Sequence, residues 1–123
     1  MSRTPHHPTR EQIELPMVLD CLSDPIRLAI VFQLAQQERV SSELCCGDFN
    51  GLAGKSNLAY HFAKLRECGL MMTRVAGTNR FMRLRRDDLN ARFPGLLDAV
   101  IKSAAKDADR LQLVAGCEVV GAG

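Results

Sequence analysis

The sequence predicts one mainly α-helical (α+β) domain that carries a single β-hairpin. Three observations predict it: a helix-start signal at residues 23–25 before an apolar segment, a one-sided apolar stripe over residues 58–65, and two β-rich segments that flank a turn at residues 76–79. The chain has 123 residues, of which 46% are hydrophobic and 24% charged, an ordinary balance for one domain with a modest core.

The N-terminal third is expected to hold two helices. Residues 1–10 are polar and rich in proline, and we expect a disordered arm there. Apolar residues at helical spacing predict a short amphipathic helix over 13–22. Asp24 can then cap a second helix with Pro25 in its first turn. This second helix is apolar almost all round, which is typical of a buried central helix.

The middle of the chain contains the clearest helix. Residues 40–54 include three glycines and show little periodicity, so a loop with a short helix is expected. After Ser56, residues 58, 62 and 65 form one buried stripe, and residues 57, 60, 61 and 64 are expected to face outward. Gly69 suits a left-handed helix end, after which Leu70 packs back.

The hairpin and the last helices follow. Residues 71–75 and 80–85 read as strands, and in the second strand Met82 and Leu84 alternate with Arg83 and Arg85, which predicts one apolar and one cationic face. Asp87 and Asp88 open another helical segment. A long helix is expected from Pro94, with an apolar side formed by Leu96, Leu97, Val100, Ile101, Ala104, Ala108 and Leu111. The predicted domain spans residues 11–111, and residues 112–123 read as a flexible tail.

A basic helix directly before a basic hairpin is typical of a winged helix-turn-helix. Between Lys55 and Arg86, eight Lys and Arg residues accompany one acid, Glu67, for a local charge of +7 in a chain of net charge +2. The rest of the chain therefore carries −5. Such a localised basic surface indicates a polyanion-binding face, although a solvated charged face would show the same pattern. In a winged helix-turn-helix, the outward helix enters the major groove of double-stranded DNA and the hairpin touches the backbone or minor groove.

Side chains that can reach DNA follow from this arrangement. The candidate contacts are Ser56, Asn57, Tyr60, His61 and Lys64 on the helix and Arg80, Arg83 and Arg85 on the hairpin. Asn pairs with adenine, His and Lys reach guanine or phosphate, Ser at a helix start binds phosphate, and Arg suits phosphate or a narrow minor groove. His61 could instead be a structural hydrogen-bonding residue. Arg27, Arg66 and Arg86 are expected to pair within the fold.

Two segments resemble the ArsR/SmtB family of bacterial repressors. LSDPIRLAIVFQLA is similar to the family's second helix, and SNLAYHFAKLRECGL is similar to its recognition helix; GTNRFMRLRRDDLNARFPGLLDAVI looks like the wing and last helix of one subgroup. The resemblance covers roughly residues 15–105. It implies a homodimer, formed by the first and last helices, that represses transcription from a palindromic operator and is released by a metal, metalloid or oxidant.

The chain departs from the family's known metal sites. The family's last-helix zinc site needs His, and residues 96–111 contain none. The segment ELCCGDF resembles the family's arsenic motif, but Gly47 replaces its second cysteine. We therefore expect reversible oxidation of the vicinal pair Cys45 and Cys46, whose strained disulfide would be labile. The alternatives are soft-metal or metalloid binding by the pair with a third thiol (Cys21, Cys68 or Cys117), or two unreactive thiols.

Other classes of protein fit less well. No apolar run approaches a membrane span and the N-terminus lacks the apolar core of a signal peptide, so a cytoplasmic location and no membrane partner are expected. A small thiol oxidoreductase would be a competing function, but the chain has no C-x-x-C motif and no βαβ pattern, so no enzyme activity and no cofactor are expected. An interaction module without DNA binding would not require the basic surface.

Overall fold

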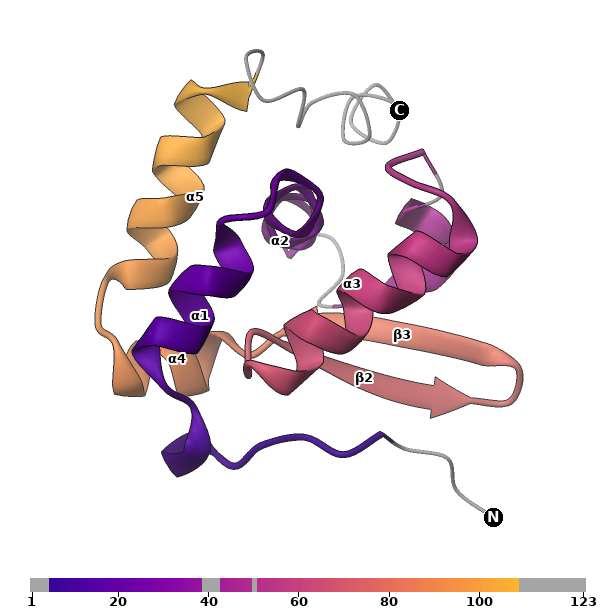
Figure 1. The fold of residues 1–123 in the computed structure, drawn as a ribbon, viewed down its shortest axis with the longest axis horizontal. Coiled ribbons are helices and arrows are strands. Elements are labelled where there is room, and N and C mark those ends of the chain that lie inside the picture. The colour runs from indigo at the N-terminus through magenta and orange to yellow at the C-terminus, as the bar shows by residue number, and fades with distance from the viewer. Residues whose placement is uncertain (1–4, 39–42, 50, 109–123) are drawn as a thin grey trace.

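The computed structural model describes residues 5–38, 43–49 and 51–108. The elements in chain order are the 3-10 turn η1 (Arg10–Gln12), α1 (Leu15–Leu22), α2 (Pro25–Gln37), β1 (Leu44–Cys45), the 3-10 turn η2 (Cys46–Phe49), α3 (Lys55–Glu67), β2 (Met71–Ala76), β3 (Asn79–Leu84), α4 (Arg86–Arg92) and α5 (Leu96–Lys106). The helices and a small antiparallel sheet form a winged helix-turn-helix, as the sequence predicts (Figure 1).

The core is built around α2. The Asp24 carboxylate accepts hydrogen bonds from the backbone N–H groups of Ile26 and Arg27, and Pro25 occupies the first turn, which confirms the predicted helix start. Residues 29–34 of α2 are all buried. The central position of this helix follows from its apolar surface, because only neighbours on several sides can cover it.

The segment between α2 and α3 differs from the expected loop with a short helix. The short helix is present as η2, but the two residues before it form β1. This strand pairs antiparallel with β3, with Leu44 opposite Met82 and Cys45 opposite Phe81, so the sheet has the order β1-β3-β2. So short a strand forms because β3 offers it a free edge, which local sequence does not reveal.

Glycines at two turns connect α3 to the hairpin and β2 to β3. Gly69 follows α3 with φ of 90°, and the Leu70 N–H donates to the Leu65 carbonyl, which confirms the predicted left-handed helix end. Ala76 pairs with Asn79, so the hairpin closes through a two-residue turn in which Gly77 has φ of 63°. The predicted strands and turn are therefore present.

The last helix begins and ends inside its predicted range. Gly95, with φ of 84°, precedes α5, which starts at Leu96 and not at Pro94. Leu97 and Ala104 are buried against the rest of the domain. Leu111 and the expected tail over 112–123 lie outside the described residues, as do residues 1–4.

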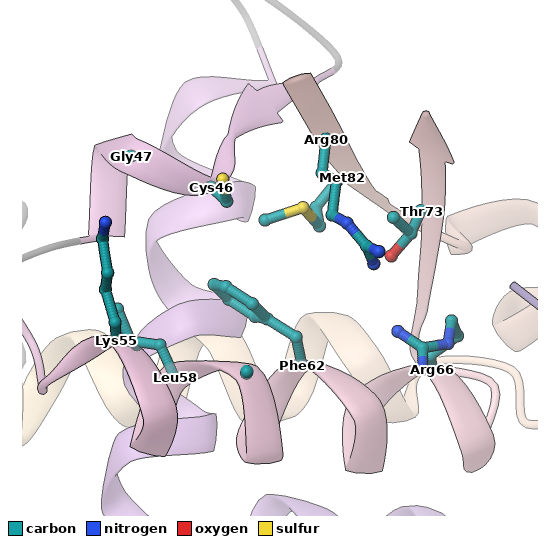
Figure 2. A pocket seen from close by; sticks show the side chains of 10 residues that line it. Cys46, Gly47, Lys55, Leu58, Phe62, Arg66, Thr73, Arg80 and Met82 are labelled. Carbon is teal, nitrogen blue, oxygen red and sulfur yellow. The ribbon is translucent and has the colours of Figure 1, made fainter. Parts of the chain in front are cut away.

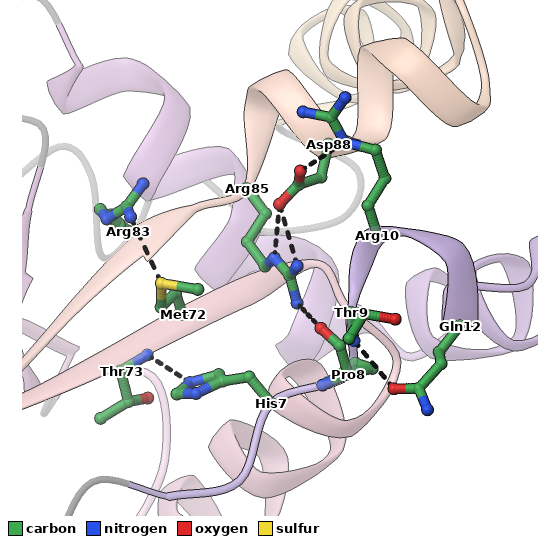
Figure 3. Close-up of polar contacts among 10 residues, drawn as sticks. All are labelled: His7, Pro8, Thr9, Arg10, Gln12, Met72, Thr73, Arg83, Arg85 and Asp88. Carbon is green, nitrogen blue, oxygen red and sulfur yellow. Dashed lines mark hydrogen bonds and ion pairs between the residues drawn. The ribbon is translucent and has the colours of Figure 1, made fainter.

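The N-terminal arm, where the sequence predicts disorder, contacts the sheet through His7 and the residue after β3 through Pro8 (Figure 3). His7 Nε2 accepts a hydrogen bond of 3.0 Å from the Thr73 N–H of β2. Arg85 then donates to the Pro8 carbonyl at 2.7 Å. These contacts join residues that are far apart in the chain, and composition alone cannot predict them.

Candidate nucleic-acid interface

The outward face of α3 is polar and exposed. Ser56, Asn57, Tyr60 and Lys64 are all exposed, as the sequence predicts, and Tyr60 is 54% exposed. The Lys64 ammonium lies 5.5 Å from the centre of the Tyr60 ring, so the two side chains share one patch of the helix surface. Gly54 occupies the cap position of α3, so Ser56 lies within the first turn, at the helix start where the sequence places it.

His61 does not belong to this outward face. It is only 5% exposed, and its Nδ1 lies 3.3 Å from Arg27 Nη1 and 4.0 Å from the Asp24 carboxylate. The prediction that His61 faces outward is wrong. The alternative interpretation, that His61 is a structural hydrogen-bonding residue, agrees with its burial and its contact with Arg27. The spacing contains a signal for this: His61 is three residues after Leu58 and four before Leu65, which places all three on one side of a helix.

Arg27 is the partner that holds His61 in place. Its Nε donates to the Cys21 carbonyl at 2.8 Å, at the end of α1, while Nη1 reaches the imidazole on α3. The expectation that Arg27 acts within the fold is confirmed. The network connects three helices and sets the position of α3 relative to α1 and α2.

The three arginines proposed for the wing lie in different places. Arg80 is exposed and on the same side of β3 as Met82, so it faces α3. Arg83 is exposed on the opposite side, where its guanidinium contacts Met72 Sδ at 3.3 Å. Arg85 follows the end of β3 and is only 6% exposed.

Arg85 is therefore a correction to the predicted cationic face. Its guanidinium pairs with the Asp88 carboxylate at 2.9 Å and donates to the Pro8 carbonyl (Figure 3). The strand alternation ends at Leu84, so it cannot predict where the next side chain points. In this position Arg85 ties the N-terminal arm to α4.

The basic residues between Lys55 and Arg86 fall into two groups, those with an ion pair and those without one. Arg74 pairs with Glu43 at 2.8 Å, and Arg86 pairs with Glu38 at 2.6 Å and Asp98 at 2.7 Å, which confirms the intramolecular role predicted for Arg86. Within the described ranges, five cations of this region have no ion pair: Lys55, Lys64, Arg66, Arg80 and Arg83. These cations lie on α3 and the hairpin, so the positive charge is concentrated there.

Arg66 lacks the salt bridge that the sequence suggested. Burial, and then the nearby positive charge of Arg80, lower the pKa of the Arg66 guanidinium below its usual value. Like charges that approach each other without a carboxylate between them are unfavourable. An anion placed near Arg66 and Arg80 would relieve this repulsion.

The cysteines of the described residues form two separate pairs. Cys45 and Cys46 are half-buried where β1 passes into η2, and the Cys45 N–H donates to the Asp48 carboxylate at 2.9 Å. Cys21 and Cys68 are buried where α1 meets the end of α3, and the Cys68 thiol donates to the Leu65 carbonyl at 3.3 Å. The neighbouring Cys68 thiol, and then burial, raise the pKa of the Cys21 thiol.

A metal or metalloid site with three thiols is not assembled in the described part of the chain. No group of three or more His, Cys, Asp or Glu side chains there is arranged to hold a metal ion. Neither Cys21 nor Cys68 joins the vicinal pair, and Cys117 lies outside the described residues.

One known protein is similar over most of the domain. The chain is 34% identical over 85 residues to the uncharacterized HTH-type transcriptional regulator YceK of Bacillus subtilis (strain 168), a match that covers 68% of this chain and 82% of the relative. The chain belongs to the HTH-type transcriptional regulators. No family model matches it.

The chain is therefore a DNA-binding regulator of transcription. This conclusion rests on its membership in the HTH-type transcriptional regulators, on the winged fold and on the exposed face of α3. This membership also favours a regulator over the thiol oxidoreductase that the cysteine pair suggested. Among the described residues, none of the helices is long and apolar enough to cross a bilayer.

Proposed function

We propose that this regulator is a homodimeric repressor of the ArsR/SmtB kind that binds a palindromic double-stranded operator. One observation carries the proposal: exposed cations on α3 and on β3 of the adjacent hairpin lack ion-pair partners in the described residues, namely Lys55, Lys64, Arg80 and Arg83. A helix of this kind fits the major groove, and a flanking hairpin reaches the backbone or minor groove.

The exposed side chains suggest a division of roles. Asn57, Tyr60 and Lys64 would contact base edges or phosphates in the groove, and Ser56 would contact phosphate. Arg80 and Arg83 would contact the DNA backbone from the hairpin. His61 and Arg85 are buried, so we propose that they position α3 and the wing and do not touch DNA.

Exposed apolar side chains on α1 support a dimer through the first and last helices. Leu15, Met17 and Leu19 are 39%, 48% and 48% exposed. Beside them, a groove of about 400 Å³ runs between α1 and α5, with Leu19 and Val100 in its walls. Apolar surface of this kind is unfavourable in water and typical of an interface. A two-fold protein would match a palindromic operator.

The vicinal thiols support a redox response. Oxidation by a hydroperoxide would remove two protons and two electrons from Cys45 and Cys46, form one S–S bond, and reduce the peroxide to water and an alcohol, or to two waters. Neighbouring Cα atoms are about 3.8 Å apart, below the usual disulfide range of about 4.4–6.8 Å, so the backbone must rearrange. The space around Gly47 is open. Because β1 pairs with β3 and η2 leads to α3, such a rearrangement would disturb both DNA-binding elements.

Fluorescence anisotropy with a duplex from the protein's own promoter region tests the DNA-binding proposal. Lys64→Gln should weaken binding. It should also make the slope of the logarithm of the binding constant against the logarithm of the salt concentration shallower by about 0.9, the contribution of one phosphate contact. Lys102→Gln, an exposed change of the same kind on α5, serves as the control and should leave the slope unchanged. A reduced protein that does not bind the duplex would contradict the proposal.

The redox response is tested in the same assay. Peroxide should lower the affinity and a thiol reductant should restore it, and Cys45→Ser and Cys46→Ser should abolish the response. Cys68→Ser should retain it, because that thiol belongs to the other pair. Loss of the response in Cys68→Ser alone would indicate that the buried pair, Cys21 and Cys68, is the redox-sensitive one. Release of DNA only by arsenite or cadmium would favour metalloid sensing.

A further inference from the structure

A cavity of about 440 Å³ lies between α3, η2 and the hairpin (Figure 2). Leu58 and Phe62 of α3 and Met82 of β3 supply apolar walls. Four polar side chains line it as well: Lys55, Arg66, Thr73 and Arg80. Figure 2 shows the last three gathered toward one end, where α3 passes beneath the strands, and Lys55 at the other end. The cavity therefore has an apolar middle, one polar end with two arginines and a threonine, and a lysine at the opposite end.

The polar end contains a hydroxyl without a partner. Thr73 is only 3% exposed, and its Oγ1 has no hydrogen-bond partner in the described structure. The Thr73 backbone is satisfied separately, because its N–H donates to His7. A buried polar group left unpaired is unfavourable, and a ligand acceptor inside the cavity would relieve that penalty.

The same end contains two cations that lack a counter-charge. Arg66 is half-buried and Arg80 is exposed, and neither has an ion pair within the described ranges. They are close enough for the charge of Arg80 to lower the pKa of Arg66. A guanidinium binds a carboxylate through paired N–H groups, and this pairing is stronger away from bulk water.

We propose that this cavity binds a small organic carboxylate with an apolar body. The carboxylate would accept hydrogen bonds from Arg66, Arg80 and the Thr73 hydroxyl. The body would pack on Phe62 and Met82, which offer no hydrogen bonds to a sugar or other polar body. A volume of about 440 Å³ lies within the range of about 300–1,000 Å³ that small-molecule sites occupy.

The position of the cavity gives the ligand a regulatory consequence. Arg80 lies at the cavity and is also a proposed backbone contact of the wing, so a bound carboxylate would neutralise a charge that DNA needs. A ligand between α3 and the hairpin would also oppose changes in the spacing of these two elements. This consequence rests on the proposed function, but binding of the carboxylate does not.

Isothermal titration calorimetry tests the binding step without DNA. The probes are octanoate and 3-phenylpropionate, with acetate and octylamine as controls that lack the apolar body or the negative charge. At least one of the two acids should bind the wild type at least tenfold more tightly than either control. No binding of either acid up to millimolar concentration, or equal binding of octylamine, would overturn the proposal.

Two variants assign the binding to this cavity. Arg66→Gln should weaken binding of the acid tenfold or more, whereas Lys102→Gln on α5 should leave it unchanged. Thr73→Val keeps the side-chain shape and removes the unpaired hydroxyl, so it should weaken ligand binding while the melting temperature of the free protein rises. Unchanged affinity in both cavity variants would overturn the assignment.

Adding the acid to the DNA complex separates the two proposals. Release of DNA from the wild type but not from Arg66→Gln supports the regulatory consequence, and persistent DNA binding at saturating acid overturns it. A protein that binds the acid but no duplex would retain the cavity proposal and refute the proposed operator binding.

Discussion

Replacing Gly69 by Ala should destabilise the domain at the junction between α3 and the hairpin. Gly69 has φ of 90°, and an added Cβ would lie 2.5 Å from Ile13 Cγ1 and 2.7 Å from its Cδ1. A left-handed conformation costs a non-glycine residue about 1–2 kcal/mol. Overpacking adds about 1–3 kcal/mol, and the reduced entropy of the unfolded chain offsets about 0.4–1 kcal/mol. The expected loss of unfolding free energy is about 3 kcal/mol by these terms.

Gly77→Ala is the matched control for this prediction. Gly77 also has a positive φ, of 63°, but a Cβ there would meet no atom within 4 Å. Only the cost of the left-handed backbone conformation remains, so Gly77→Ala should lower the free energy of unfolding by about 1 kcal/mol.

Thermal unfolding by circular dichroism at one protein concentration compares the two variants. At about 4 °C per kcal/mol for a domain of this size, Gly69→Ala should lower the melting temperature by about 12 °C and Gly77→Ala by about 4 °C. Equal shifts in both variants would refute the steric argument, because the contact with Ile13 is the feature that distinguishes the two glycines.

Two further predictions concern acid stability and thiol reactivity. The hydrogen bond from Arg10 holds the pKa of Asp88 below its usual value. The ionised Asp88 carboxylate therefore stabilises the folded protein above the unfolded pKa of about 3.9, and this stabilisation is lost as pH falls through the lower pKa of the folded state. Urea unfolding should therefore show a stability difference between wild type and Asp88→Asn that is constant above about pH 5 and shrinks below about pH 4; a difference independent of pH would contradict this. Brief iodoacetamide labelling of the native protein, mapped by mass spectrometry, should modify Cys45 or Cys46 before Cys21, whose thiol is buried and has a raised pKa, and faster labelling of Cys21 would refute this order.

The helix ends and the hairpin follow from local sequence. Asp24 caps the helix that begins at the next residue, because the bonds it makes reach only two and three positions ahead. Gly69 ends α3 because its own backbone can adopt a positive φ. The hairpin turn likewise depends on four consecutive residues. Signals confined to a few neighbouring residues are readable without knowing the rest of the fold.

The surroundings of several side chains in the candidate site could be determined only from the tertiary structure. Arg85 lies in the sequence beside Arg83, but its environment is set by Pro8 and Asp88, which approach from the arm and α4. The burial of His61 depends on Arg27 of another helix, although the spacing within α3 contains a signal for it. The predicted DNA face therefore kept four of its five helix residues and lost His61 and Arg85.

The sequence by itself determined the order of the main helices and the hairpin, the helix start at Asp24, the helix end at Gly69, the turn and the concentration of positive charge on α3 and the hairpin, since these depend on nearest neighbours and composition. Only the tertiary structure decided that β1 adds to the sheet, that Cys21 lies beside Cys68, and that a cavity with an unpaired Thr73 hydroxyl lies between α3 and the hairpin. The physical reason is that pairing, burial and cavity shape arise between segments distant in the chain, where local propensity carries no information.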